Sequence, residues 1–150
     1  MSDNLLRDPI FRADTVDGAM ALSLPEVLAA LARDRIHCFP ALRAHQRHAW
    51  HAFLAQLGAI ALHAAGRDAP PEDAEGWAGL LRGLTPGHED DAPWRLVVRD
   101  LAKPAFLQPP SPADAPPFAK RIGTPDALDV LVAARNFEVK QAAAARADSE

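Results

Sequence analysis

The spacing of apolar residues predicts an N-terminal β-hairpin followed by a helix. Two short, largely apolar runs, 9–12 and 19–22, flank Asp17-Gly18, a dipeptide suited to the positive-φ positions of a hairpin turn. Ser23-Leu24-Pro25-Glu26 then combines an N-cap hydroxyl, a first-turn proline and a glutamate that can bond back to the cap. This is the pattern of a capping box, so we expect a helix that ends near Arg35.

The strongest helical pattern covers residues 42–65. At about 100° per residue, its apolar side chains fall within an arc of roughly 120°. They are Leu42, Trp50, Phe53, Leu54, Leu57, Ile60 and Ala61. Gly66 and the two prolines at 70 and 71 end this helix. A shorter helix over about 72–84 and a polar loop over 85–93 are expected next, because apolar residues from Trp77 to Leu84 recur at three- and four-residue spacing.

The pattern after residue 93 is mixed. Residues 94–98, with sequence WRLVV, predict a strand, and seven prolines between Pro104 and Pro125 impose extended backbone. Thr124-Pro125-Asp126 is a helix start, and the helix is expected to end near residues 135–137. The chain is therefore predicted to be one α+β domain over 1–150, with a small N-terminal sheet, three or four helices and more helix than strand.

Composition limits the class of protein. Leu, Ile, Val and Phe make up 35 of 150 residues, a thin supply for a core, so we expect a partner to complete it. A single cysteine, Cys38, excludes an intramolecular disulfide, and the start MSDNLLRDP lacks the basic and apolar regions of a signal peptide. We therefore expect a soluble, cytoplasmic protein without a membrane span.

The charge is unevenly distributed along the sequence. Seven acids and one arginine lie between Asp68 and Asp91, so this segment contributes −6 to a total of −4 and the rest of the chain carries +2. The overall acidity therefore does not exclude a nucleic-acid partner, although +2 is too small to indicate one.

Candidate catalytic and metal-binding groups are weak. Four histidines, at 45, 48, 51 and 63, fan over the polar side of the 42–65 helix, so they are expected to face solvent or a partner instead of a metal. His88-Glu89-Asp90-Asp91 lacks the spacing of a calcium loop. Cys38 beside His37 is interpreted as a semi-buried structural thiol, because sequence neighbours usually point apart. We expect no metal, no cofactor, no small-molecule substrate and no enzyme activity.

A second group of polar residues could contact nucleic acid. Lys120 and Arg121 precede the last predicted helix, and Arg135, Asn136, Phe137 and Lys140 follow it. Cations neutralise phosphates, an amide can read base edges and a phenylalanine can stack or wedge. An ordinary helix end with surface charges explains the same residues, and spacing alone favours that explanation.

The order of several motifs is similar to one known family. Asn4-Leu5-Leu6 with Asp8-Pro9-Ile10, the hairpin, the Ser23-Leu24 helix entry and the long Ala/Leu helix resemble the start of the large subunit of Cascade, the type I-E CRISPR surveillance complex. Residues 106–110 (FLQPP), and 124–129 (TPDALD) followed by Arg135-Asn136, resemble later segments. The similarity spans nearly the whole chain, but family members continue into a C-terminal helical bundle, so we expect a fragment, a split subunit or a minimised variant.

The resemblance implies a non-catalytic subunit in antiviral defence. Such a subunit binds near the crRNA 5′ end and helps recognise the protospacer-adjacent motif in duplex DNA, with crRNA, target DNA and other Cascade subunits as partners. It assigns motif recognition to Arg135, Asn136 and Phe137, and a phosphate contact to Lys140. Lys120 and Arg121 stay candidate nucleic-acid contacts because of their charge. The alternative is a small helical adaptor or regulatory protein that binds a protein partner without nucleic acid.

Overall fold

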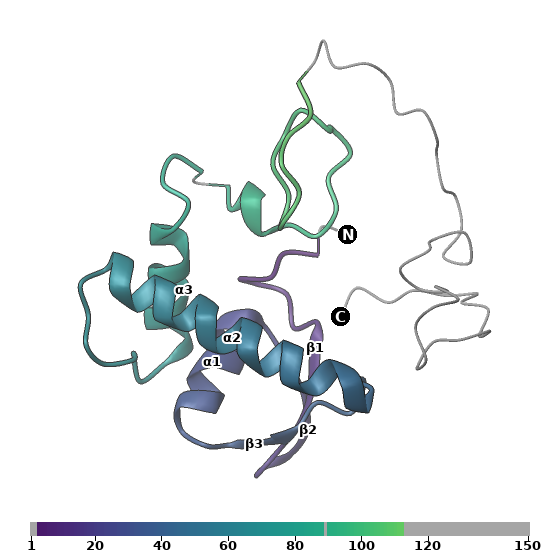
Figure 1. Cartoon of the computed structure of the whole chain (residues 1–150), viewed down its shortest axis with the longest axis vertical. Helices are drawn as coiled ribbons and strands as arrows, with labels where there is room; N and C mark the ends of the chain where they lie inside the picture. The colour runs from purple at the N-terminus through teal and green to yellow at the C-terminus, as the bar shows by residue number, and fades with distance from the viewer. Residues whose placement is uncertain (1–2, 89, 113–150) are drawn as a thin grey trace, which may run out of the picture. The chain divides into compact units, whose positions relative to one another are not determined.

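The computed structural model describes residues 3–88 and 90–112, which belong to one unit of the chain. Its elements, in chain order, are β1 (Phe11–Thr15), β2 (Gly18–Leu22), α1 (Leu24–Ala32), β3 (Ile36–Cys38), α2 (Ala44–Ala64), α3 (Ala74–Gly83) and the short 3-10 helix η1 (Ala92–Trp94) (Figure 1). This is the α+β arrangement expected from the sequence, with more helix than strand. The proposed last helix and all six candidate nucleic-acid contacts lie outside the described residues.

The three strands form an antiparallel sheet in the order β2-β1-β3. The predicted hairpin is confirmed, and its register pairs Phe11 with Leu22 and Thr15 with Gly18. The pairing places Val16 and Asp17 in the turn, whereas Gly18 begins β2 with a φ of 112°, which glycine adopts without strain. β3 was not predicted, because three residues are too few to show an alternating pattern.

The capping box of α1 is present as predicted. The Glu26 carboxylate accepts a hydrogen bond from the Ser23 backbone N–H at 2.6 Å. The helix ends at Ala32, three residues earlier than expected, and Asp34 then takes a left-handed φ of 53° as the chain turns into β3. An aspartate tolerates this conformation better than most residues. Leu24, Val27 and Leu28 are buried.

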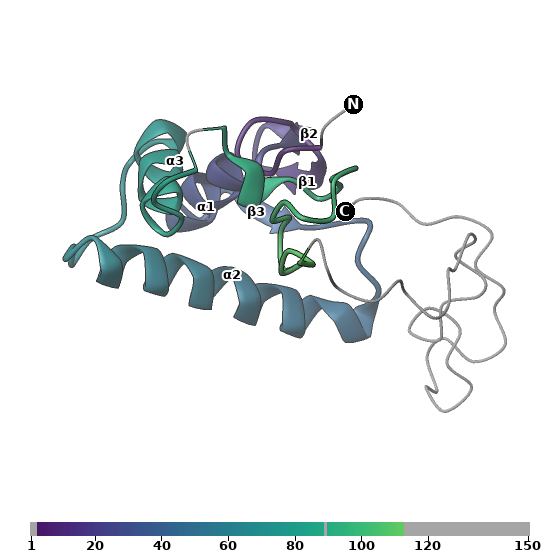
Figure 2. The same ribbon diagram turned by 90° about the horizontal axis from the view of Figure 1, so that it is seen from above.

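The helices α2 and α3 match the predicted spans closely. The long helix α2 lies along one side of α1, α3 and the sheet (Figure 2). It buries only Leu54, Gly58 and Ala61, all from its second half. For α3, the side chain of Asp73 caps the first turn by accepting from the Gly76 N–H at 2.8 Å. None of the helices described is long and apolar enough to cross a membrane.

The strand predicted at 94–98 is wrong. Trp94 belongs to η1, Arg95 forms an isolated antiparallel bridge with Asn4, and no regular element covers residues 96–112. The apolar residues of this segment do not share one buried face: Trp94 is buried, whereas Val97 is 64% exposed. A strand needs a paired neighbour, and the bridge to Asn4 is the one pairing that this segment has within 3–88 and 90–112.

Candidate functional site: an aromatic groove beside α2

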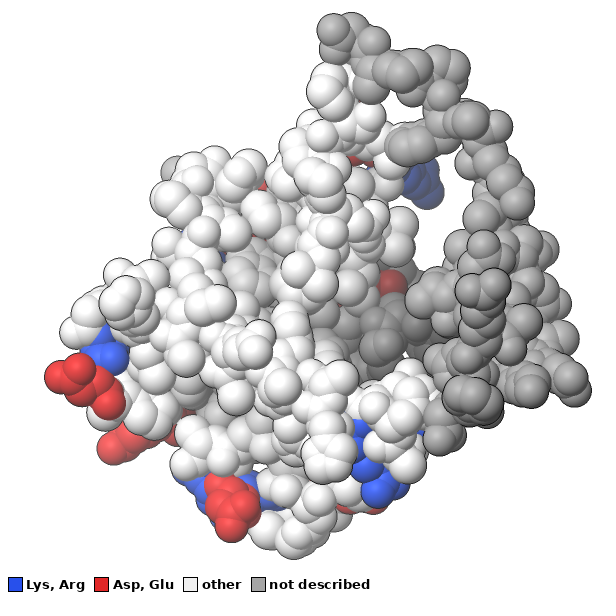
Figure 3. Space-filling model, in the orientation of Figure 1, with Lys and Arg blue, Asp and Glu red and all other residues white. Residues whose placement is uncertain are grey.

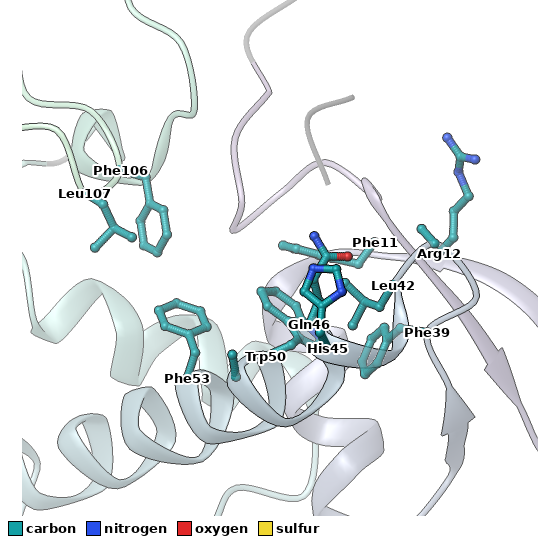
Figure 4. Close-up of a pocket in the computed structure, with 12 residues that line it drawn as sticks. Phe11, Arg12, Phe39, Leu42, His45, Gln46, Trp50, Phe53, Phe106 and Leu107 are labelled. Atoms are coloured by element: carbon teal, nitrogen blue, oxygen red, sulfur yellow. The ribbon is translucent and has the colours of Figure 1, made fainter. Parts of the chain in front are cut away.

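Aromatic side chains from four parts of the chain line an open groove of about 490 Å³ (Figure 4). β1 supplies Phe11, the segment before α2 supplies Phe39, and α2 supplies Trp50 and Phe53. Phe106 comes from a turn near the end of the described chain. The remaining lining residues are Arg12, Ala41, Leu42, His45, Gln46, Ala49 and Leu107. We call this set the aromatic groove.

The rings of the groove pack mainly on one another. Trp50 lies 5.4 Å from Phe11 and 5.6 Å from Phe53 between ring centroids, with interplanar angles of 32° and 23°. Phe39 meets Trp50 edge-on at 5.8 Å. Such pairs contribute about 0.5–1.5 kcal/mol each beyond the area that they bury. These rings therefore form one connected cluster along the groove.

A tight turn over residues 105–108 closes one end of the groove. The Gln108 N–H donates to the Ala105 carbonyl at 3.0 Å, and the Ala105 N–H donates to the Gln108 carbonyl at 3.2 Å. Phe106 stacks on the buried Trp94 at 5.6 Å. Leu107 is 80% exposed and has a φ of 56°, a left-handed conformation that is strained for leucine. The turn therefore holds an apolar side chain outward at the groove edge.

Polar groups are restricted to the rim of the groove. Among its lining residues Arg12 is the one with a formal charge, and its guanidinium is directed outward at the β1 end (Figure 4). His45 and Gln46 lie on the first turn of α2. The Gln46 side chain accepts a hydrogen bond from the Arg43 N–H at 2.9 Å, which satisfies one donor at the helix start. The groove thus offers apolar contact with cationic and amide groups at its edge.

A buried carboxylate lies outside the lining of the groove. Asp91 is 1% exposed and has a left-handed φ of 55°. The Nε groups of Arg82 and Arg7 donate to it at 2.9 Å and 2.8 Å, and the Asn4 amide donates to its backbone carbonyl at 3.3 Å. Hydrogen bonds from Arg82 lower the pKa of the Asp91 carboxyl, burial opposes that shift, and the hydrogen bond from Arg7 adds to it. The pair of arginines joins α3 to the N-terminal segment.

The cysteine and the histidines noted in the sequence occupy half-buried or exposed positions. Cys38 is half-buried and donates to the Asp14 carboxylate at 3.3 Å, an interaction that raises the pKa of the thiol, with partial burial adding to it. His37 is exposed. The four histidines of α2 are exposed, as the helical spacing predicted, but His45 lines the groove and His51 lies 5.9 Å from the Phe39 ring, so not all of them are on the side away from the apolar residues. Within 3–88 and 90–112 no group of three or more His, Cys, Asp or Glu side chains is placed to hold a metal ion.

The sequence patterns indicate single parts of the groove but not the groove as a whole. Trp50 and Phe53 were assigned to the buried arc of the long helix, and Phe106 was noted within the FLQPP segment. Phe11 and Phe39 gave no periodic signal, because each lies in or beside a short strand. The clue available in the sequence was the grouping of Phe39, Trp50 and Phe53, three of the nine aromatic residues in the chain, in and just before the long helix.

The fold and the groove define a small α+β unit with an open apolar groove. Comparisons with protein-family models, with curated proteins and with solved structures find no match to this chain.

Proposed function

We propose that this chain is a non-catalytic subunit of a cytoplasmic CRISPR RNA-guided DNA surveillance complex, corresponding to the N-terminal region of the type I-E large subunit. It acts near the crRNA 5′ end and helps recognise the protospacer-adjacent motif of duplex DNA. The observation that supports this proposal best is structural: two motifs of the resemblance, one at each end of the described chain, pack on the same short segment.

The first motif is Asn4-Leu5-Leu6. The Leu5 N–H donates to the Trp94 carbonyl at 2.9 Å, and the Leu96 N–H donates to the Asp3 carbonyl at 2.9 Å. The buried Asn4 also holds its own turn, because its side-chain oxygen accepts from the Leu6 N–H at 2.9 Å. Each residue of this motif is buried and has a structural task.

The second motif is the FLQPP segment. The Phe106 N–H donates to the Arg95 carbonyl at 2.7 Å, and the Gln108 side chain donates to the Leu96 carbonyl at 2.9 Å. Both motifs therefore use the backbone of residues 94–96, although they are about a hundred residues apart in sequence. Short matches that arise by chance have no reason to meet in one structural junction, so this meeting favours a shared architecture.

The proposed division of labour is physically reasonable. In RNA-guided recognition, base pairing reads the target, and the protein reads only a short motif in duplex DNA. The resemblance assigns that reading to Arg135, Asn136 and Phe137, with Lys140 as a phosphate contact. Lys120 and Arg121 are added as nucleic-acid contacts because cations neutralise phosphates. An asparagine can bond base edges, and a phenylalanine can wedge between base pairs.

Purification of the tagged chain from its native host tests the proposal. The expected result is co-purification of a crRNA and of several proteins that form the backbone of the complex, identified by RNA sequencing and mass spectrometry. A single protein partner without RNA would contradict the proposal and favour the adaptor. Recovery of neither RNA nor protein under conditions that preserve assemblies also argues against it.

Site-directed variants test the assigned residues once the complex is in hand. Asn136→Ala and Phe137→Ala are expected to weaken binding of target duplex by about tenfold or more, because each removes a motif contact, while crRNA stays bound. Gln56→Ala, which removes an exposed amide from the outer side of α2, is the matched control and should leave binding unchanged. Equal binding by all three variants would remove Asn136 and Phe137 from the recognition site.

A further inference from the structure

We propose that the aromatic groove is a docking site for an apolar segment of a second polypeptide, and that this segment carries acidic side chains beside its apolar ones. The inference concerns a protein partner, and it does not depend on any nucleic-acid function of the chain. It rests on the exposure of the groove, the arrangement of its rings and the sign of the charge around it.

The surface beside the groove lacks the charged side chains that a solvent-exposed surface normally has. Residues 48–66, which form most of α2 and its end, contain no Asp, Glu, Lys or Arg. On the face that carries α2, charged side chains of the described residues gather near the edges and leave the centre uncharged (Figure 3). Solvent-facing helices normally carry charged residues, and a continuous uncharged surface is typical of an interaction site.

The exposed apolar groups in the groove are held in position by the fold. Leu107 remains 80% exposed in a strained backbone conformation, although a glycine would adopt the same φ without strain. Ala41 and Ala49 are also exposed in the lining, and small side chains there keep the floor accessible. The groove therefore presents aliphatic and aromatic surface that only a second apolar group can cover.

The rings favour a polypeptide over single-stranded nucleic acid as the occupant. Base stacking requires free ring faces, but Phe53 already stacks with Trp50, and Phe106 with Trp94, each at 5.6 Å between ring centroids. Nucleic acid also requires a cation for most of its phosphates, and Arg12 is the sole formal charge in the lining. Aliphatic and aromatic side chains of a peptide, in contrast, pack on ring edges and methyl groups without either requirement.

The surrounding charge selects the character of that peptide. Residues 36–66 contain two arginines, Arg43 and Arg47, and no Asp or Glu, and Arg12 lies at the groove edge. Arg43 and Arg47 lie at the start of α2, and the positive end of the helix dipole lies there too, so both favour a negatively charged partner. An apolar segment flanked by carboxylates is therefore complementary to the groove, and a segment flanked by lysines is not.

A binding assay with defined probes tests the proposal on the full 150-residue chain. The first probe is a fluorescein-labelled amphipathic peptide with Leu at helical i, i+3, i+4 and i+7 positions and Glu elsewhere. The second has Lys in place of every Glu, and the third is a single-stranded RNA of mixed sequence. Fluorescence anisotropy is expected to show saturable binding of the Glu peptide, and weakening of that binding as the salt concentration rises.

Paired variants locate the binding. Ala49 and Ala52 are both exposed alanines of α2, but only Ala49 lines the groove. Ala49→Glu is expected to weaken binding of the Glu peptide by about tenfold or more, because it places a like charge among apolar contacts. Ala52→Glu should change that binding by less than about twofold. Leu107→Ser should also weaken it, and circular dichroism of each variant establishes that the fold is intact.

Several results would overturn the proposal. These are equal binding of the Lys peptide, the same loss for Ala49→Glu and Ala52→Glu, or no saturable binding of the Glu peptide. RNA binding that Ala49→Glu abolishes would identify nucleic acid as the occupant. A dimer that Ala49→Glu dissociates, measured by light scattering, would identify a second copy of the chain. Failure to recover crRNA from the host would leave this result unaffected.

Discussion

The two halves of α2 differ in both composition and surroundings. The second half contributes Leu54, Gly58 and Ala61 to the core, where they face α1 and α3. In the first half no residue is fully buried, and Trp50 and Phe53 border the aromatic groove instead. One continuous helix is thus packed by its own chain at one end and left open at the other.

The difference shows that a stripe of apolar residues on a helix predicts that these side chains will be covered. It does not say whether the same chain or another molecule covers them. Glycine and alanine let the second half approach α3 closely: a Cβ at position 58 would lie 3.4 Å from the Trp77 ring. The first half carries large rings that pack sideways on Phe11 and Phe39 and leave space beyond. Interiors are close-packed, and an open apolar space of this size is the surface that the proposed peptide would cover.

The largest expected effect concerns the packed half. Leu54 is 2% exposed, and its truncation in Leu54→Ala leaves a cavity among α1, α2 and α3. We expect the free energy of unfolding to fall by about 3 kcal/mol, measured by urea denaturation with far-UV circular dichroism. A loss below about 1 kcal/mol would mean that the packed half is as loosely held as the open half.

The second prediction concerns Asp91, which fastens α3 to the N-terminal segment. Asp91→Asn keeps the shape and tolerates the φ of 55°, but it removes the charge that Arg7 and Arg82 bind. We expect a loss of about 2 kcal/mol at pH 7, less than for a fully enclosed ion pair because both arginines are partly exposed.

The pH dependence of this effect has a definite sign. The pKa of Asp91 is lower in the folded state, so the carboxylate contributes stability above its unfolded-state pKa of about 3.9 and loses that contribution as the pH falls below it. The stability difference between wild type and Asp91→Asn should be constant above about pH 5 and shrink below pH 4. A difference that grows on acidification would contradict the proposed pairing. Arg95→Met, at an arginine that pairs with Asp90 instead, is the control.

Much of the fold follows from local signals in the sequence. The Ser23 to Glu26 capping box, the apolar spacing of α2 and α3, and Gly66 after α2 predict those helices within a few residues. The predicted strand at 94–98 failed because its β-branched residues indicate a preference for extended structure, whereas a strand also needs a neighbour. β3 was missed for the complementary reason: pairing with Asp14 and Thr15 creates it, and its own three residues do not.

The candidate site was less accessible to sequence reasoning. The groove is assembled from β1, the 39–42 segment, α2 and the 105–108 turn, so no single window contains its pattern. Leu107 illustrates the difficulty. Its backbone has a positive φ, a conformation that a leucine in the sequence gives no reason to expect. The Asp91 junction likewise joins residues 84 positions apart, and an acidic loop was the natural interpretation of His88 to Asp91. The motif residues near 120 and 135–140 stay a prediction.

The third prediction pairs neighbouring residues across the two environments. Phe53→Ala removes the contacts of a half-buried ring with Trp50 and Phe106, at 5.6 Å and 6.1 Å, on the open side of the helix. We expect a loss of about 1.5 kcal/mol, roughly half that of Leu54→Ala despite the larger side chain, because the ring is already partly in water. Equal losses from both substitutions, in the same urea assay, would mean that the groove side is packed as tightly as the core.

The smallest expected effect has the opposite sign. Gly58→Ala should stabilise the protein by about 0.5–1 kcal/mol, because alanine is the better helix former and its Cβ would make an ordinary contact, 3.4 Å from Trp77. Gly79→Ala in α3 is the matched control, since nothing lies within 4 Å of its added Cβ and only the helix preference changes. If Gly58→Ala gains less than Gly79→Ala, or destabilises, Trp77 cannot yield, and Gly58 is required for the approach of α2 to α3. If the two gains are equal, the glycine at 58 is not needed for packing, and the contrast between the halves of α2 rests on Leu54 and Ala61.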